Sequence, residues 1–316
     1  MGMLKYPLMQ KLIRVAVIGA GKLGKRHAET YSKMSGIDLV GVCDVHADRA
    51  KESADTCGTR FFTDHRALLS RVDAASIVVP SHKHHDISRD FLEKGIHLLI
   101  EKPITTRLKD ADNLLRLAAK HHSLIQVGHI ERFNSAIRAI KNIIKNPRFI
   151  ECHRLGPYDP RVADVGVTLD LMIHDIDIVL DLVKSPVKHI DSVGACIISK
   201  TEDIANARVR FKNNAVCNLT ASRVTPEVQR RIRIFQDDAY ICLDYVTQTA
   251  EITTKKNSHI HHKKINITKT DSLKEELSDF IDCVRHQRHP LVSGQEGREA
   301  LAVALEISKQ ITRRRP

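Results

Sequence analysis

The first third of the chain alternates short aliphatic runs with amphipathic segments of helix length. Continuous apolar runs are typical of strands buried on both faces, and the segments between them have the length of helical crossovers. The pattern therefore predicts a parallel, doubly wound sheet, an α/β domain of the Rossmann type, over residues 1–128. The runs that we expect to form its strands are Leu12 to Ile18, Leu39 to Cys43, Ala75 to Val79, His97 to Ile100 and Leu124 to Val127.

The pattern changes after Asn146. An amphipathic segment from Asp164 to Val183 predicts one long helix, and strand-like runs joined by turn-like pairs follow it. Two further helices are expected over about Leu273 to Arg285 and Gly294 to Thr312. Residues 129–316 are thus predicted to form an α+β domain on a large, mostly antiparallel open sheet that binds substrate and mediates oligomerisation. Whether the final helices pack back on the first domain stays open.

Charge and cysteine content narrow the class of protein. The 316 residues carry a net charge of +12, which is scattered along the chain and favours an anionic ligand, and no nucleic-acid-binding module accompanies it. The seven cysteines form no C-x-x-C pair, so we expect neither a disulfide framework nor a thiolate zinc site, and a reducing, cytoplasmic setting. No apolar run is long enough to span a bilayer. We therefore expect no nucleic-acid or membrane partner.

A glycine-rich turn follows the first predicted strand. Gly19 permits a tight turn, Gly21 lets the backbone approach a pyrophosphate, and Gly24 allows close packing of helix on strand. The helix that begins here presents unpaired N–H groups to phosphates. The motif predicts dinucleotide binding by Gly19, Ala20, Gly21, Lys22, Leu23 and Gly24.

An acidic residue, Asp44, ends the second predicted strand 20 residues beyond the last glycine. A carboxylate at this position accepts hydrogen bonds from the ribose hydroxyls and repels a 2′-phosphate. We therefore expect NAD rather than NADP, although Arg49 or Lys51 could reach a 2′-phosphate. The alternative role for Asp44 is a cap on the next helix.

Two more motifs complete a family resemblance. Glu101-Lys102-Pro103 ends a predicted strand, and Asp170-x-x-x-His174 lies on the long helix. With the glycine turn, these motifs resemble the signature of the glucose–fructose oxidoreductase/inositol dehydrogenase (Gfo/Idh/MocA) family over essentially the whole chain. The resemblance implies a sugar or polyol dehydrogenase that transfers a hydride to NAD and needs no metal. It also implies that Pro80, Ser81, His84, Glu101 and Lys102 line the cofactor.

The chemistry of these side chains suits hydride transfer from an alcohol. An ammonium at Lys102 can stabilise the developing charge on the reacting oxygen, and His174 can accept the hydroxyl proton near neutral pH. Asp170 is spaced i, i+4 from His174, so in an α-helix it could orient the imidazole. A surface lysine, an ordinary helix pair, or a metal pair with Asp175 or Asp177 are the alternatives.

Two stretches resemble the branch of the family that oxidises nucleotide sugars, in particular the 3-hydroxyl of UDP-N-acetylglucosamine. They are Gly128 to Asn134 and Arg154 to Arg161. Guanidinium groups suit a diphosphate, so the expected substrate-binding residues are Arg132, Asn134, Arg154, Arg161, Asp170 and His174. The alternatives are that each arginine supports a loop and that Asn134 caps a helix.

Other functions and the state of assembly remain to be separated. An inositol or polyol dehydrogenase of the same family, and an NAD-responsive regulator without activity, are the competing hypotheses. The apolar residues of Ile190 to Ile198 and Ala215 to Thr220 suggest that the open sheets of two copies pack face to face. We therefore expect a homodimer or homotetramer formed through the C-terminal sheet.

Overall fold

The computed structural model describes residues 12–159 and 165–314, which form two compact units. The first unit comprises the chain up to Glu101 together with Asn113–Gln126 and Leu277–Pro290. The second unit comprises Lys102–Asp112, Val127–Glu276 and the chain from Leu291 onward. Lys102 therefore folds with the second unit, one residue after the strand that ends at Glu101. The division predicted at residue 128 stays a prediction.

The first unit is built on a parallel sheet of six strands in the order β3-β2-β1-β4-β5-β6. This order confirms the predicted doubly wound, Rossmann-type sheet, with β1 and β4 side by side at its centre. Its elements are β1 (Ile13–Ile18), α1 (Lys22–Ser32), β2 (Ile37–Cys43), α2 (Ala47–Cys57), β3 (Arg60–Phe62), β4 (Ala74–Ile77), α3 (His84–Leu92), β5 (His97–Glu101), α4 (Leu108–Lys120) and β6 (Ile125–Gly128).

Central strands of this sheet are buried on both faces. Val15, Ala16 and Val17 of β1 have no exposed surface, and the same holds for Leu98 and Leu99 of β5. Consecutive buried residues in one strand require cover on both sides, which the crossover helices provide. The uninterrupted apolar runs in the sequence have this physical cause.

The second unit contains an eight-stranded sheet in the order β14-β13-β12-β11-β7-β10-β9-β8. Strands β7 and β10 pair in parallel, whereas the other pairs are antiparallel, so the predicted mostly antiparallel sheet is confirmed. Its elements are α5 (Ser135–Lys141), β7 (Phe149–Leu155), η5 (Thr168–Met172), α6 (Ile173–Val183), β8 (Val187–Ala195), β9 (Ile204–Phe211), β10 (Val216–Ser222), β11 (Gln229–Gln236), β12 (Ala239–Asp244), β13 (Thr249–Lys256), β14 (His259–Lys264), α7 (Ser272–His286, whose first turns belong here) and α8 (Gly294–Arg313).

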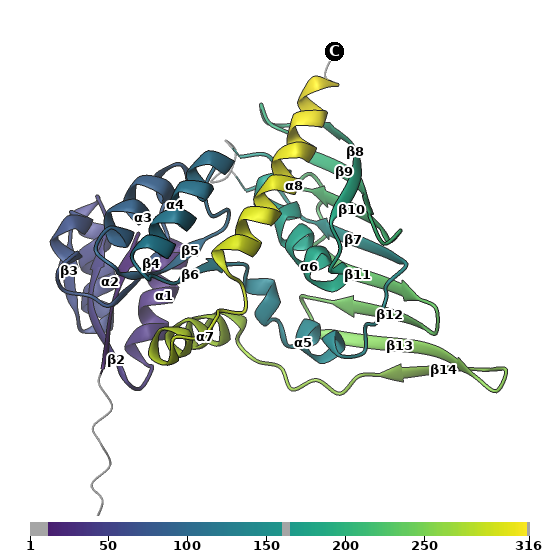
Figure 1. Ribbon diagram of the computed structural model, residues 1–316, viewed down its shortest axis with the longest axis horizontal. Helices are drawn as coiled ribbons and strands as arrows, with labels where there is room; N and C mark the ends of the chain where they lie inside the picture. Colours follow the sequence, from purple (N-terminus) through teal and green to yellow (C-terminus); the bar gives the residue numbers. More distant parts are fainter. Residues whose placement is uncertain (1–11, 160–164, 315–316) are drawn as a thin grey trace, which may run out of the picture. The chain divides into compact units, whose positions relative to one another are not determined.

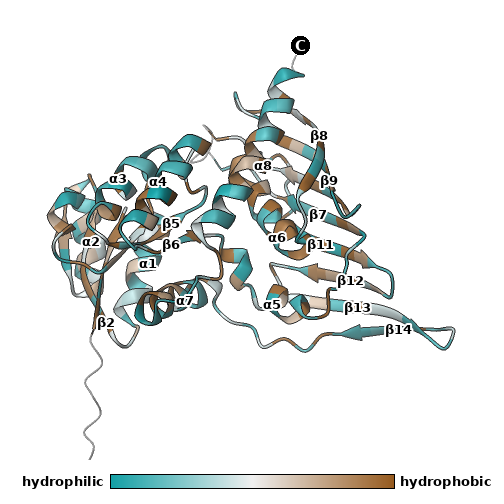
Figure 2. Ribbon diagram, in the orientation of Figure 1, coloured by the Kyte–Doolittle hydropathy of each residue, from teal (hydrophilic) through white to brown (hydrophobic). Residues whose placement is uncertain are grey.

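Helices α5, α6 and α8 lie on one face of this sheet (Figure 1). Buried and exposed residues alternate along β9, where Ala205, Ala207 and Val209 face the helices while Asn206 and Arg208 do not. The strands of this sheet accordingly carry both hydrophilic and hydrophobic residues along their length (Figure 2). An alternation of this kind is expected of a sheet with one solvated face.

The apolar residues of Ala215 to Thr220, which the sequence suggested as a packing surface for a second copy, lie on the face of the sheet that the helices cover. Ala215, Cys217 and Leu219 belong to the core beneath the helices. On the opposite face, neighbouring positions carry Asn218 and Thr220. The prediction that apolar residues of Ala215–Thr220 would meet a second copy is therefore wrong, because the pleat turns them inward.

Among the described helices, none combines the length and the apolar character that a bilayer span requires.

Candidate active site

The glycine turn of the first unit has the geometry that its sequence predicts. Gly19 has a φ of +105°, and a Cβ there would collide with the carbonyl oxygen of Val78. A Cβ on Gly24 would collide with the carbonyl oxygen of Gly19. A Cβ on Gly21, the N-cap of α1, would meet nothing within 4 Å, so the space beside it is open to a ligand. Lys22 and Leu23 form the first turn of α1.

A cavity of about 420 Å³ adjoins this turn. Gly19, Gly21 and Asp44 are among its lining residues. The Asp44 carboxylate accepts hydrogen bonds from the backbone N–H groups of Ala20, at 2.7 Å, and His46, at 2.9 Å. Asp44 thus joins the end of β2 to the glycine turn and lines the cavity. Room beside Gly21, N–H groups at the start of α1 and a cavity-lining carboxylate fit a dinucleotide.

Residues of the loop after β4 have different surroundings. Pro80 lines the cavity together with His82 and Lys83. His84 is buried, and its Nε2 lies 2.9 Å from the carbonyl oxygen of Val79. Ser81 opens the 3-10 turn that precedes α3. Pro80 therefore faces the cavity, whereas the described contact of His84 holds the loop in its own turn.

An ion pair in the second unit joins two of the predicted catalytic residues. Lys102 Nζ lies 2.9 Å from Asp170 Oδ1 and also donates to the Asp170 carbonyl oxygen at 2.6 Å. About a fifth of each side chain is exposed, so the pair is accessible to a ligand. The Lys102–Pro103 peptide bond is cis. Glu101, on the first-unit side of the junction, lies 3.2 Å from the buried His27.

The expected hydrogen bond from Asp170 to His174 is not formed. Asp170 lies within η5, a π-helical turn, and its carboxylate is paired with Lys102. Within residues 12–159 and 165–314, the buried Nδ1 of His174 has no hydrogen-bond partner. A π turn holds one more residue than an α turn, so positions four apart across it no longer share one face. The i, i+4 argument fails for this reason.

His174 nevertheless lies in a cationic neighbourhood. The pKa of the His174 imidazole lies well below the usual value for histidine, and the largest cause is its partial burial. The charges of Lys102 and Arg154 lower it further. The ring of His129, which the sequence analysis did not single out, packs edge-on at 6.2 Å between centroids. His174 is therefore neutral at physiological pH, in the form that accepts a proton.

The arginines predicted to bind diphosphate are enclosed by carboxylates. Arg154 is 2% exposed and bonds Asp175 and Glu131 at 2.9 Å. Arg132, equally enclosed, bonds Asp177 at 2.7 Å, and further carboxylates surround it. A guanidinium fork already filled by acids has no edge left for a phosphate. The structure therefore favours the alternative of internal support for both residues.

Asn134 also takes the alternative that the sequence left open. Its side chain accepts a hydrogen bond from the backbone N–H of Ala136 and so caps α5. The amide donates to Glu131 and to the carbonyl oxygen of Tyr245. Asn134 is 3% exposed, so no edge faces a sugar. Arg161 lies outside the described residues.

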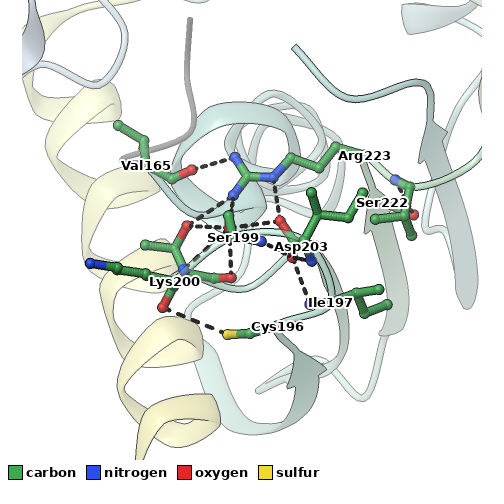
Figure 3. A network of polar contacts seen from close by, with 11 residues as sticks. Val165, Cys196, Ile197, Ser199, Lys200, Asp203, Ser222 and Arg223 are labelled. Carbon is green, nitrogen blue, oxygen red and sulfur yellow. Dashed lines mark hydrogen bonds and ion pairs between the residues drawn. The ribbon is translucent and has the colours of Figure 1, made fainter. Parts of the chain in front are cut away.

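A buried network supports the start of η5 (Figure 3). Arg223 donates to Asp203 at 2.7 Å, to Ser199, and to the carbonyl oxygen of Val165 at 2.7 Å. Glu202, next to Asp203, accepts a hydrogen bond from the backbone N–H of Val167 at its carbonyl oxygen. The β8–β9 loop thereby fixes the backbone that enters the turn carrying Asp170. No sequence pattern predicts this network, because Arg223 follows the end of β10 without a recognisable motif.

The part of the chain that the structure describes contains no group of three or more metal-ligating side chains placed to hold an ion. Asp175 and Asp177, which the sequence offered as metal partners for Asp170 and His174, are instead paired with Arg154 and Arg132.

Comparison with known proteins gives matches along most of the chain. Residues 13–129 match the oxidoreductase family with an NAD-binding Rossmann fold (GFO/IDH/MocA), and residues 139–242 match the GFO/IDH/MocA C-terminal domain. The chain is 36% identical over 302 residues to UDP-N-acetylglucosamine 3-dehydrogenase from Acidithiobacillus ferrooxidans, covering 93% of this chain and 96% of the relative. A solved structure of that enzyme has a TM-score of 0.91 and covers 95% of this chain and 97% of the other. Myo-inositol 2-dehydrogenase from Thermotoga maritima is 26% identical, covering 96% and 97% of the two chains.

Proposed function

The chain belongs to the Gfo/Idh/MocA oxidoreductase family, and from that premise we propose that it oxidises the 3-hydroxyl of UDP-N-acetylglucosamine or of a related UDP-amino sugar. It is an NAD-binding oxidoreductase that acts on CH–OH groups, as the family match and the dehydrogenase relatives establish. The finer assignment of substrate rests on the 36% identity to the UDP-N-acetylglucosamine 3-dehydrogenase over nearly all of both chains.

The observation that carries the proposal is the grouping of Lys102, Asp170 and His174. The Lys102 ammonium, held by Asp170, donates a hydrogen bond to the reacting oxygen and stabilises the charge that grows on it. The neutral imidazole of His174 accepts the hydroxyl proton. Asp170 serves Lys102 in this scheme, fixing the position of the ammonium and balancing its charge.

The first unit would hold the cofactor through the glycine turn and Asp44. The backbone N–H groups at the start of α1 face the space beside Gly21, where a pyrophosphate fits, and Asp44 is placed for the ribose hydroxyls. When bound, NAD accepts the hydride from the carbon that bears the oxidised hydroxyl.

A substrate panel tests this function. Purified protein with NAD is mixed with UDP-N-acetylglucosamine, UDP-glucose, myo-inositol and scyllo-inositol, and the absorbance of the reduced cofactor is followed. We expect turnover with UDP-N-acetylglucosamine and, after reduction of the product with borodeuteride, deuterium at C3. Lys102→Met serves as the inactive control, with NAD binding retained. Turnover of inositols without any UDP-sugar would reject the proposal in favour of a polyol dehydrogenase.

Self-association is part of the proposal. We propose that two copies pair through the helix-free face of the second sheet, where Asn206, Arg208 and Asn218 offer polar contacts. The exposed Val193, of the apolar run Ile190 to Ile198, lies opposite Asn206 on the same face. Light scattering at micromolar concentration gives the mass in solution, and a monomer there would contradict the pairing.

A further inference from the structure

Arg230 occupies a distinctive position at the start of β11. In the antiparallel pair of β11 with β7, it lies directly opposite Arg154. Residues directly opposite each other in such a pair project from the same face of the sheet. That face is the helix-covered one, because Arg154 and the next residue on the same side of β11, Ile232, are both buried. Arg230 thus lies at the open end of the face that carries the active-site helix.

The two cross-strand arginines differ in their partners. Arg154 is enclosed by Glu131 and Asp175. The Arg230 side chain is partly exposed, and its guanidinium makes no hydrogen bond or ion pair with any residue of the described ranges 12–159 and 165–314, although the Arg230 carbonyl oxygen accepts from the Tyr245 N–H. Arg132 is likewise buried among carboxylates, and the buried Arg223 donates to Asp203, to a carbonyl oxygen and to two hydroxyl groups. Arg230 therefore retains a guanidinium fork that is available to a ligand.

The surroundings of Arg230 favour an anion. Partial burial and the neighbouring charge of Arg154 lower the pKa of Arg230, because both disfavour a second cation there. The charge of Arg230 in turn contributes to the low pKa of His174, which places the guanidinium within electrostatic range of the imidazole. Asp170 is among the acids that act on Arg230. Glu131 and Asp175 act on it as well, although no carboxylate of the described residues contacts the guanidinium. A bound anion would give Arg230 a direct partner close to the reacting groups.

We infer that Arg230 binds the diphosphate of the nucleotide-sugar substrate, the role that Arg132 and Arg154 were expected to fill. The inference rests on the proposed function, since an uncharged polyol would leave the guanidinium without a partner. A planar fork with several N–H donors suits two phosphate oxygens, and its position at the start of β11, within electrostatic range of His174, would orient the sugar toward the imidazole.

Arg230→Gln and Arg230→Lys test the inference, with Arg231→Gln as the matched control. Arg231 is the next residue, points to the opposite face and pairs with Asp244. The dissociation constant of UDP is measured by calorimetry on enzyme saturated with NAD. We expect it to rise about tenfold or more in Arg230→Gln and less in Arg230→Lys, as for loss of a charge-assisted hydrogen bond, and to stay unchanged in Arg231→Gln.

Uridine is the second probe, because it lacks phosphates. Its binding should be the same in all variants, and the KM for UDP-N-acetylglucosamine should rise with kcat held within about threefold. An unchanged UDP affinity in a folded Arg230→Gln enzyme would overturn the inference while wild-type turnover of UDP-sugars left the proposed function standing. Wild-type protein that turns over only inositols would instead overturn the proposed function. Circular dichroism checks the fold, and Arg230→Lys supplies the answer should the glutamine variant unfold.

Discussion

The cofactor turn of the first unit and the charged cluster of the second unit are built from different material. In the first unit, the cofactor turn consists of backbone: a glycine with positive φ, the open space beside Gly21 and the N–H groups at the start of α1. In the second unit, the cluster consists of long charged side chains, with Lys102 paired with Asp170 and Arg154 paired with Glu131 and Asp175. A site made of backbone depends on local conformation, whereas a site made of side chains depends on which distant residues the fold brings together.

This difference predicts which property of the protein each substitution should change. Changes in the turn should affect cofactor affinity, and changes in the charged cluster should affect either the chemical step or the stability of the second unit. Five substitutions, in four experiments, test that separation.

The largest effect is expected at His174. We predict that His174→Asn lowers kcat by about 10³-fold, since a general base contributes about two to four orders of magnitude. The imidazole is the active form only when neutral, and its pKa is lowered, so wild-type activity should persist as the pH falls through the ordinary histidine range and decline only at more acidic pH. Initial rates over a pH series check this. An acid limb at the ordinary histidine pKa, or an unchanged limb in His174→Asn, would contradict the assignment.

Arg154→Met should act on folding rather than on the reaction itself. The change leaves Glu131 and Asp175 buried without their cation, which costs about 3–5 kcal/mol. Urea unfolding measures the loss, with the exposed Arg210→Met as a control that should change stability by less than about 0.5 kcal/mol. Burial raises the pKa of Asp175 already in the wild type. The loss of unfolding free energy in Arg154→Met should therefore become smaller as the pH is lowered, because Glu131 and Asp175 then take up protons and lose their charge.

Gly19→Ala and Gly21→Ala form a matched pair in the turn. An alanine at position 19 must adopt a φ of +105° and displace the Val78 carbonyl, so we expect both a lower melting temperature and an NAD affinity weakened about tenfold or more. An alanine at position 21 meets open space and should leave the melting temperature unchanged. Any loss of NAD affinity in Gly21→Ala would then show that the added methyl group keeps the pyrophosphate of NAD away from the backbone. Equal melting temperatures for the two variants would show that the turn tolerates a side chain at both positions.

The smallest effect is expected at Asp44, through the choice of cofactor. Asp44→Asn removes the charge that opposes a 2′-phosphate while keeping an acceptor for the Ala20 N–H. The ratio of kcat/KM for NADP to that for NAD should rise several-fold, roughly 1 kcal/mol in preference. Arg49→Gln, which alters a different residue lining the same cavity, is the comparison. If Arg49→Gln lowers the ratio and Asp44→Asn leaves it unchanged, Arg49 rather than Asp44 sets the choice of cofactor.

Elements with a clear hydrophobic period were predicted correctly from the sequence. Features that depend on contacts between distant residues were not. Strand β7 was not predicted, although Phe149–Leu155 alternates between half-buried and buried residues, and it lies in the middle of the second sheet. Its alternation was hidden by polar residues at both kinds of position, including the buried Arg154. The π-helical geometry at Asp170 was equally invisible, because a regular helix and one with an inserted residue share the same apolar pattern.

The sequence by itself determined the parallel sheet, the glycine turn and the pairing of a lysine with a helix-borne aspartate and histidine as candidates. These follow from hydrophobic period and from the conformations that glycine alone adopts readily. Only the tertiary structure decided that Asp170 pairs with Lys102, that Arg132 and Arg154 are enclosed by carboxylates, and that the Arg230 guanidinium has no partner among the described residues. The reason is that a charge takes its role from partners tens of residues away, and those partners are chosen by strand register and helix packing.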